Sequence, residues 1–582
     1  MTLWWLQDDA RVTTEREAIK QLDAKAPWLK GPTWALSGSN LTVQADIQVG
    51  GVDYEVVLEY PALFPAAPPT VSPRDPGQRW SSHQYLGGSG ELCLEWGPDN
   101  WEPGITGADL LESAYKLLST EKGDSEDQLR VVASRHQESL GQSLRRESWR
   151  VAITPEFEVF ISDLPPGTVG TLDMRFVRRG GNSTLHVRSA QRASQEPWMA
   201  PALPKTLDLT AGFSLKARFV RTDLPRDSYA GESLSTLREE LRKCGCLDAL
   251  EPAEESAITL LFLRNSAHGV HVLWLANKED GRVTELATFR IPTEPLRTGD
   301  GAEVVSRKRV GVVGLGSAGS KIALSLARCG VRDFLLVDDD IVLPGNLERH
   351  TLDYRNVGEH KVDGMKAQME ALASDMNVRV ARSRLSGQEP SSTVSYLLGQ
   401  LSACDVVVDA TANPRTFNVL AETVRQAQTP MVWLEVFGGG IGGFVARFRS
   451  GKDPDPFAAR ARFHSYLEDK EPAPGTPAKP YAADAADGQP LIATDADVAV
   501  IAHHAARLAL DILEEHEPST FPKSLYVIGL ERGWLFEEPF HAIGLDIGAP
   551  TDVPAGKAES LSQDNIDFLG EVVKRGAHGS SD

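Results

Sequence analysis

The chain has 582 residues, 41% of them hydrophobic, and this length predicts about three or four globular domains. Its net charge of −21 argues against direct nucleic-acid binding, because phosphate contacts require clustered lysine and arginine. Neither a long apolar run typical of a transmembrane helix nor a signal-peptide pattern occurs, so we expect a cytoplasmic protein without a membrane partner.

The spacing of the cysteines argues against zinc binding and against disulfide bonds. The cysteines are Cys93, Cys244, Cys246, Cys329 and Cys404. None of them belongs to a CxxC pair, so we expect neither a zinc site nor a disulfide framework. Cys329 and Cys404 adjoin apolar runs and read as buried small hydrophobes, whereas Cys93 lies in a loop.

Residues 1–150 alternate between helical and extended patterns. The periodicity predicts helices at Thr13–Leu22, Gly107–Ser119 and Glu126–Glu147, and strands at Leu41–Val49 and Val52–Tyr60. A loop rich in glycine and tryptophan carries Cys93. A cysteine in such a loop is more often exposed and reactive than one inside an apolar run.

The proline-rich stretch Phe64–Pro69, the loop sequence around Cys93 and this order of elements resemble a ubiquitin-conjugating domain. The resemblance implies an α+β fold over residues 1–150, in which Cys93 carries a modifier as a thioester and His83 matches the family histidine. The family asparagine that stabilises the oxyanion has no counterpart here. Either Tyr85, Asn100 or backbone N–H groups supply that stabilisation, or transfer to lysine proceeds differently.

Residues 151–303 carry no motif with evident chemistry. The patterns predict strands at Val151–Ile161, Leu172–Val177, Ala257–Arg264 and Val270–Leu275, and a helix at Leu234–Leu241. Without a glycine loop, a cluster of ligands or a nucleophile pattern, this region is expected to be a structural α/β module.

A glycine loop follows the apolar strand Val310–Val313. Its glycines are Gly314, Gly316 and Gly319. A helical segment, Lys321–Cys329, and a second apolar strand, Phe334–Val337, come next, and this strand ends at Asp338. Strand, glycine turn, helix and acidic strand end together predict a nucleotide site, with phosphates at the helix N-terminus and Asp338 on the ribose. An NAD(P)-binding Rossmann domain is the default reading of that pattern.

Three residues beyond this unit favour ATP instead. Asn346, Arg349 and Lys361 have no evident use in a dehydrogenase. Cations at these positions suit a triphosphate, because they stabilise charge on the transferring phosphoryl group and on the leaving pyrophosphate.

The stretch Val304–Asp546 resembles the adenylation domain of the ubiquitin-activating enzyme superfamily, which includes ThiF- and MoeB-type proteins. The resemblance implies a Rossmann-like domain over residues 304–582 that binds ATP and Mg²⁺. It places the glycine loop at the phosphates, Asp338 on the ribose and Asp340 near the metal or the phosphates. It also implies triphosphate contacts by Asn346, Arg349 and Lys361, with Lys366 as the rival of Lys361.

Further family positions depart from the pattern. A second aspartate that helps bind magnesium is replaced by Ala412, which leaves Asp409 as the candidate metal ligand. The glycine-rich segment Val436–Phe444 is predicted as a strand that either lets a substrate tail pass closely or is a site of tight structural packing. A crossover loop is expected at about residues 450–495, with the flexible stretch Pro472–Pro490 inside it.

The expected activating cysteine before the helix Asp497–Leu513 is replaced by Ala493. Three explanations stay open. Ala493 is an engineered replacement of cysteine, the adenylate passes directly to Cys93, or Thr494 forms an oxyester.

As a whole, the chain resembles the conjugating–activating fusions of bacterial CBASS antiphage operons. This resemblance implies a linker or inactive adenylation-like domain at residues 151–303, and homodimers. The expected reaction is ATP-dependent adenylation of a protein C-terminus and its transfer through a thioester to a lysine. The expected modifier is a cGAS/DncV-like nucleotidyltransferase. The alternatives are a bacterial ubiquitin-like modifier, a sulfur-carrier adenylyltransferase and an inactive binding scaffold.

Overall fold

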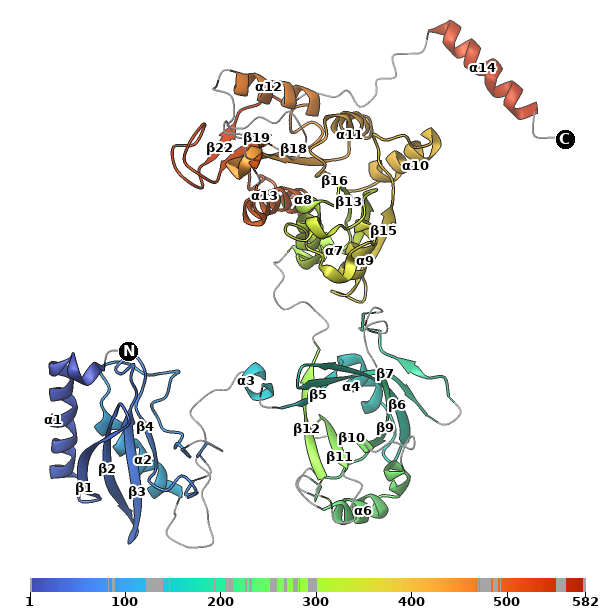
Figure 1. Ribbon diagram of the computed structural model, residues 1–582. Helices are drawn as coiled ribbons and strands as arrows, with labels where there is room; N and C mark the ends of the chain where they lie inside the picture. The colour runs from blue at the N-terminus through green and yellow to red at the C-terminus, as the bar shows by residue number, and fades with distance from the viewer. Residues whose placement is uncertain are drawn as a thin grey trace. The chain divides into compact units, whose positions relative to one another are not determined.

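The computed structural model (Figure 1) describes residues 3–81, 83–85, 89–121, 140–145, 147–192, 195–201, 203–204, 207, 213–225, 228–229, 233–251, 259–265, 269–275, 281, 283–291, 301–468, 470, 483–484, 490–491, 493–550 and 562–578. Its contacts divide the chain into two compact units, Met1–Ser143 and Leu144–Asp582. None of the helices in the described part combines the length and the apolar character needed to cross a bilayer.

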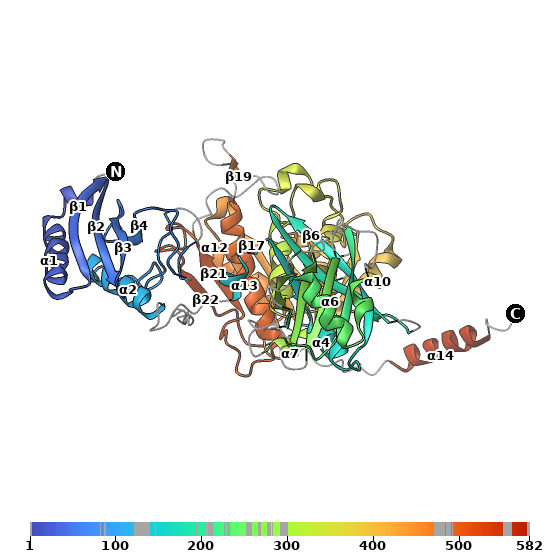
Figure 2. The same ribbon diagram turned by 90° about the horizontal axis from the view of Figure 1, so that it is seen from below.

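The first unit is an antiparallel four-stranded sheet flanked by helices (Figures 1 and 2). Its elements are the 3₁₀ helix Trp4–Leu6, α1 (Asp9–Lys25), β1 (Leu29–Ser37), β2 (Asn40–Val49), β3 (Val52–Tyr60), β4 (Thr70–Pro73) and α2 (Gly107–Glu121). Asp8 caps α1 by accepting a hydrogen bond from the Arg11 N–H. Buried Glu15 accepts hydrogen bonds from the Tyr60 hydroxyl and the Gly107 N–H, so α1, β3 and α2 meet at one carboxylate.

The predicted helix Glu126–Glu147 lies mostly outside the described residues, which contain only α3 (Leu140–Leu144) of it. A second, eight-stranded sheet follows. Its strands are β5 (Trp149–Ile153), β6 (Val169–Arg179), β7 (Asn182–Gln191), β8 (Trp198–Met199), β9 (Phe213–Arg221), β10 (Thr259–Asn265), β11 (Gly269–Leu275) and β12 (Val283–Arg290). The sheet closes on itself because β5 pairs with both β12 and β7.

This second sheet is mostly antiparallel, whereas an adenylation-like half requires parallel strands joined by helices. The structure therefore departs from the adenylation-like alternative for residues 151–303. The predicted strand Val151–Ile161 is also wrong, since β5 ends at Ile153 and α4 (Pro155–Ser162) begins two residues later. Thr154 caps that helix by accepting from the Phe157 N–H, and Pro155 suits its first turn. The predicted helix at Leu234 is present as α6 (Leu234–Lys243).

The third sheet carries the glycine loop. Its strand order is β15-β14-β13-β16-β17-β18-β21-β22. The strands are β13 (Arg309–Val313), β14 (Asp333–Val337), β15 (Asn377–Ala381), β16 (Val406–Asp409), β17 (Met431–Val436), β18 (Gly442–Phe448), β21 (Leu525–Gly529) and β22 (Ala542–Leu545). The first five in that order are parallel and the last three are antiparallel.

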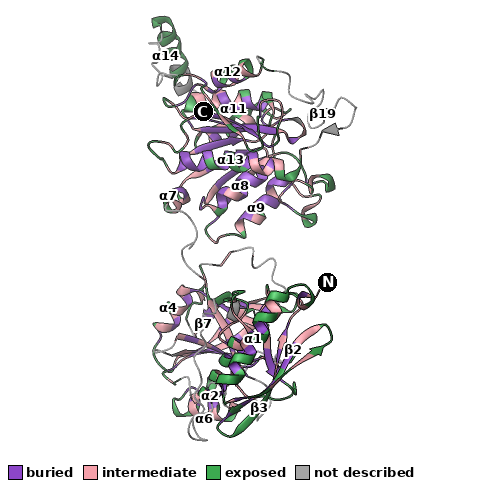
Figure 3. Cartoon of the chain, turned by 90° about the vertical axis from the view of Figure 1, so that its left-hand side faces the viewer, coloured by how far each residue is buried: buried purple, intermediate pink, exposed green. Residues whose placement is uncertain are grey.

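Helices cover both faces of this sheet. They are α7 (Ala302–Ser306), α8 (Ser317–Arg328), α9 (Lys361–Glu370), α10 (Ser391–Ser402), α11 (Pro414–Ala427), α12 (Pro456–Glu468) and α13 (Asp495–Leu513). Alternate strand residues face two separate cores, one with α8 and α13 and one with α10, α11 and α12. Helices α8 and α13 lie side by side, and their inner faces are buried (Figures 1 and 3).

One predicted feature of this region is wrong, and a second lies partly outside the described residues. Val436–Phe444 is not one strand: it contains the end of β17, a turn at residues 437–441 and the start of β18, because Gly439 and Gly440 have φ values of 74° and 81° that break the extended run. The expected crossover loop at 450–495 contains the 13-residue helix α12, and most of its Pro472–Pro490 stretch lies outside the described residues.

Candidate functional site

The glycine loop between β13 and α8 requires glycine at two of its three glycine positions. Gly314 has a φ of 85°, a conformation that strains other residues. A Cβ on Gly319 would lie 1.8 Å from the Gly314 carbonyl oxygen. The loop is therefore tightly packed and leads directly into the N-terminus of α8, where a helix favours a phosphate group.

Asp338, directly after β14, lies against this loop. Its carboxylate accepts hydrogen bonds from the Leu315 N–H at 2.6 Å and from the Asp340 N–H at 2.8 Å. Burial raises the pKa of Asp338 above its usual range. The structure thus brings Asp338 and the glycine loop together.

Lys361, the first residue of α9, points back at the acidic end of β14. Its Nζ lies 2.7 Å from the Asp340 carboxylate, and its side chain is only 8% exposed. The Asp340 side chain is 60% exposed, so this pair is open to solvent on the carboxylate side. The Lys366 ammonium contacts Glu370 on its own helix instead, at 3.6 Å.

Asn346 and Arg349 lie on the segment between β14 and α9. The Asn346 side-chain oxygen accepts from the Leu343 N–H at 2.9 Å, which closes a short 3₁₀ turn. The Arg349 carbonyl accepts from the Ser317 hydroxyl at 2.7 Å, at the start of α8. Arg349 is therefore fixed beside the glycine loop through its backbone.

Lys321 also belongs to this site, although the motifs considered in the sequence do not include it. Its Nζ donates to the Arg349 carbonyl at 2.6 Å and lies 2.7 Å from the Asp495 carboxylate at the start of α13. The Arg349 guanidinium reaches the Ala493 carbonyl at 3.5 Å. A lysine in the first turn after the last glycine is the signal that would have identified it.

His350 supports the loop from the opposite side. Burial lowers the pKa of His350 to about 4. Its Nδ1 accepts from the Leu352 N–H, so the neutral ring donates from Nε2 to the Leu315 carbonyl at 2.7 Å. This hydrogen bond fixes the loop carbonyl that precedes Gly316.

Asp409 ends β16 and lines a small cavity together with Ala412, Glu435 and Arg460. One of its oxygens accepts from both the N–H and the hydroxyl of Thr411, and the side chain is almost fully buried. Burial raises the pKa of Asp409 to about 6. A carboxylate of this kind fits Mg²⁺ when the remaining ligands are phosphate oxygens and water, which is how Mg²⁺ is usually bound.

The carboxylates of Asp338, Asp339 and Asp340 are the one group among the described residues that could gather around a cation. Asp338 is occupied by two backbone N–H groups, and Asp340 by Lys361. Asp339 lies 3.8 Å from Arg384. These partners leave the cluster less suited to Mg²⁺ than Asp409.

Cys93 and His83 come together in the first unit. The Cys93 N–H donates to the His83 carbonyl at 2.7 Å, and the cysteine is half-buried. The Asn100 side chain is hydrogen-bonded within its own turn: its oxygen accepts from the Gly97 N–H, and its NH₂ group donates to the Glu95 carbonyl. Tyr85 is 47% exposed. Of the alternatives for oxyanion stabilisation, the Asn100 amide is thus already engaged.

Comparison with known proteins finds relatives of part of this chain. The model of the ThiF family matches residues 294–532, a stretch that includes the glycine loop. A segment of 129 residues is 33% identical to the ATP-dependent ubiquitin transferase-like protein Cap2 of Enterobacter hormaechei, covering 22% of this chain and 21% of that protein. Another of 142 residues is 28% identical to the sulfur carrier protein ThiS adenylyltransferase of Escherichia coli, covering 24% of this chain and 54% of that protein.

A solved structure of E. coli MccB with ATP aligns with 43% of this chain and 66% of its own, at 15% identity and a TM-score of 0.33. The chain spans about a fifth of the length of the first curated relatives that it matches.

Proposed function

We propose that this protein adenylates the C-terminal carboxylate of a protein substrate with ATP and transfers the acyl group through a thioester to an amine. The observation that carries the proposal is the convergence on one glycine loop of Asp338, Arg349 and Lys361. Asp338 accepts from the loop, Arg349 is bonded to the start of α8, and Lys361 reaches the acidic end of β14. A ThiF-family match over the same residues supports ATP as the nucleotide.

In the first step a substrate carboxylate oxygen attacks the α-phosphorus of ATP, and pyrophosphate leaves. The glycine loop, with Gly314, Gly316 and Gly319, holds the phosphates, and Asp338 the ribose. Arg349 and Lys361 stabilise the charge that develops on the phosphoryl group and on pyrophosphate, with Asn346 beside them. Mg²⁺, held by Asp409 and by phosphate oxygens, would neutralise further charge there.

In the second step the Cys93 thiolate attacks the acyl carbon and AMP leaves. A substrate amine then attacks the thioester, and the Cys93 thiol is released. The backbone contact between Cys93 and His83 keeps both in one loop region. Ala493 has no nucleophile, so in this chain the acyl group passes from AMP to Cys93 without a cysteine at position 493.

The biological setting is a further part of the proposal. We further propose a modifier of cGAS/DncV-like type, a role in antiphage defence, a cytoplasmic location and a homodimer. The similarity to an ATP-dependent ubiquitin transferase-like protein supports the transfer chemistry of this proposal. We also propose domain limits of 1–150, 151–303 and 304–582, which the three separate sheets support. The alternatives are a ubiquitin-like modifier, a sulfur carrier and a binding scaffold.

ATP–pyrophosphate exchange measured with candidate substrate proteins tests the adenylation step. Exchange that depends on a free substrate C-terminus is expected. No exchange with any candidate, including proteins encoded by neighbouring genes, would favour the scaffold. A DTT-sensitive adduct on Cys93 separates amine conjugation from sulfur transfer, because sulfur-carrier activation does not need that residue.

A further inference from the structure

Glu91 lies two residues before Cys93 and has no role in the mechanism described so far. The two residues belong to a segment that pairs in antiparallel fashion with a neighbouring segment of the first unit. The Tyr85 N–H donates to the Glu91 carbonyl at 2.9 Å, and the Cys93 N–H donates to the His83 carbonyl at 2.7 Å. These two hydrogen bonds fix the register of the segments, so Glu91 lies opposite Tyr85 and Cys93 opposite His83.

The side chains of this pairing alternate between the core and the outer face. Gln84 and Leu92, which form the bridge between the two hydrogen bonds, are 8% and 2% exposed. The Gln84 amide is fixed in the interior, where it donates to the Gly90 carbonyl at 2.7 Å. Because neighbouring residues of an extended segment point to opposite faces, Glu91 and Cys93 share the outer face.

Glu91 and Cys93 are close enough to act on one substrate group. Successive residues of an extended segment are about 3.4 Å apart, so two alternate residues on one face are separated by about 7 Å between their Cα atoms. A lysine that approaches an acyl group on the Cys93 sulfur therefore comes within reach of the Glu91 carboxylate.

The Glu91 carboxylate is not engaged elsewhere in the described part of the chain. Glu91 is half-buried, and its carboxylate takes part in no hydrogen bond or ion pair with the described residues. Burial raises the pKa of Glu91 above its usual range, and no cation among the described residues opposes that shift. A carboxylate whose pKa is raised toward neutrality is the stronger base, so it accepts a proton more readily.

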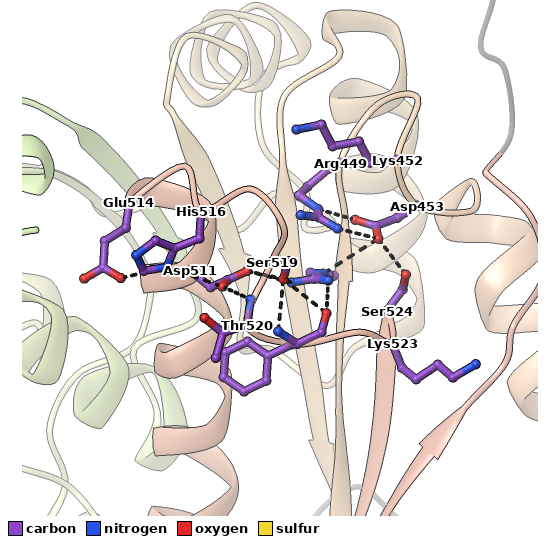
Figure 4. Close-up of polar contacts among 12 residues, drawn as sticks. Arg449, Lys452, Asp453, Asp511, Glu514, His516, Ser519, Thr520, Lys523 and Ser524 are labelled. Carbon is purple, nitrogen blue, oxygen red and sulfur yellow. Dashed lines mark hydrogen bonds and ion pairs between the residues drawn. The ribbon is translucent and has the colours of Figure 1, made fainter.

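Two buried aspartates of the adenylation-like region show the contrasting, structural case. Asp453 accepts from Arg449 at 2.8 and 3.1 Å and from the Ser524 hydroxyl at 2.6 Å, and Asp511 accepts from the Ser519 hydroxyl at 2.6 Å (Figure 4). Their hydrogen bonds hold separate stretches of chain together. The carboxylate beside the candidate nucleophile has no such structural partner in the described residues, so it can bind a substrate group.

We propose that Glu91 is the general base of amine transfer: its carboxylate binds the ammonium group of the attacking lysine and accepts one of its protons. This inference rests on the proposed function, because it assigns a residue to the final step at Cys93. The neutral amine then forms the C–N bond, and the C–S bond breaks with its electron pair on sulfur. The second nitrogen proton passes to that sulfur, so Cys93 leaves as a thiol and Glu91 returns its proton to water.

The same carboxylate is of no use for loading Cys93. A thiol ionises more readily beside a positive charge than beside a negative one. Glu91 therefore suits the step that consumes the thioester and not the step that forms it. This difference separates a general base from a residue that only supports the loop, because loss of loop structure would slow both steps.

Chemical loading of Cys93 tests the transfer step without adenylation. The full chain is incubated with the 2-mercaptoethanesulfonate thioester of acetylglycylglycine, and peptide mass spectrometry follows the acyl group on Cys93 and its release to Nα-acetyl-lysine at neutral pH. We expect Glu91→Gln to load at least as fast as wild type. Its release to Nα-acetyl-lysine should be slower by about tenfold or more, because the proton acceptor is lost.

A second nucleophile and a matched variant are the controls. Hydroxylamine is largely unprotonated at neutral pH and needs no base, so Glu91→Gln should release its acyl group to hydroxylamine within about twofold of the wild-type rate. Glu17→Gln removes an exposed glutamate of α1 and should match the wild type with both nucleophiles.

Three results would overturn the inference and leave the proposed function standing. They are equal release to Nα-acetyl-lysine by Glu91→Gln and wild type, equal slowing of that variant with hydroxylamine, and slowing found only in His83→Gln or Glu95→Gln. A wild-type Cys93 that never loads would overturn the inference together with the thioester step of the proposed function. Failure of adenylation is detected separately, by ATP–pyrophosphate exchange.

Discussion

Lys321 joins the helix after the glycine loop to the start of α13, through its 2.7 Å contact with Asp495. The lysine side chain is 8% exposed and the aspartate side chain 53% exposed. Loss of the aspartate leaves a largely buried cation without its carboxylate, so the contact holds the start of α13 in place.

We therefore predict that Asp495→Asn loosens the start of α13. Backbone amide exchange of residues 493–498, measured by mass spectrometry, should accelerate roughly fivefold to tenfold, since a half-exposed pair contributes on the order of 1 kcal/mol. Asp375→Asn, which removes an exposed partner of Arg332, is the matched control and should not alter this segment. Equal exchange in both variants would show that the Lys321 contact is not a restraint.

Lys361→Ala should lower substrate-dependent ATP–pyrophosphate exchange by about a hundredfold or more, because a cation beside the leaving pyrophosphate is lost. Lys366→Ala, five residues further along the same helix, should change the rate less than about threefold, since Lys366 contacts Glu370. A larger effect of Lys366→Ala would reassign the triphosphate contact to that residue.

Two glycines of the nucleotide loop should behave differently when replaced by alanine. Gly319→Ala should destabilise the domain by several kcal/mol, roughly the cost of severe overpacking, since the new Cβ meets the Gly314 carbonyl. Gly316→Ala should fold like the wild type, because no atom lies within 4 Å of its Cβ position. Urea unfolding of both variants measures the two free energies of unfolding and compares them with that of the wild type. An unfolded Gly316→Ala variant would contradict this packing.

His350 should make stability depend on pH. Its folded-state pKa of about 4 lies below the unfolded value of about 6.5, so the unfolded chain binds the proton more tightly. Stability is therefore fully present above pH 6.5 and falls by up to about 3 kcal/mol as the pH drops to 4. His350→Gln should flatten this part of the urea-unfolding profile, while His503→Gln, at an exposed position of α13, should leave it unchanged.

Cys93→Ala should abolish the DTT-sensitive substrate adduct and leave ATP–pyrophosphate exchange within about twofold of wild type, because the thiol acts only after adenylation. Cys244→Ala removes an exposed cysteine outside residues 1–150 and should keep the adduct. Non-reducing gels of both variants make the comparison. An adduct that survives in Cys93→Ala would assign the thioester to another residue.

The parts of the fold that depend on local pattern could be predicted from the sequence. Strand, glycine turn and helix around Gly314 follow from short-range periodicity, and Asp338 lies beside the loop as its spacing suggests. Val151–Ile161 was predicted as one strand because its apolar run fits either structure, whereas the Thr154 cap starts a helix inside it.

Contacts between residues that are far apart in the chain could not be predicted from the sequence. Lys321 and Asp495 are separated by more than 170 residues, and only the packing of α8 on α13 brings them together. The hydrogen bonds of the Asn100 side chain could not be predicted either, because its partners are backbone groups that no residue pattern encodes.

The two lysines of the nucleotide loop region carry built-in counter-ions, Asp340 for Lys361 and Asp495 for Lys321. A nucleotide that binds here would therefore compete with these two carboxylates for the lysine ammonium groups. A triphosphate offers enough charge to replace both of them, whereas a monophosphate would separate the same pairs for fewer contacts in return. Under the proposed function, we therefore expect these two charge pairs to favour a triphosphate over a monophosphate.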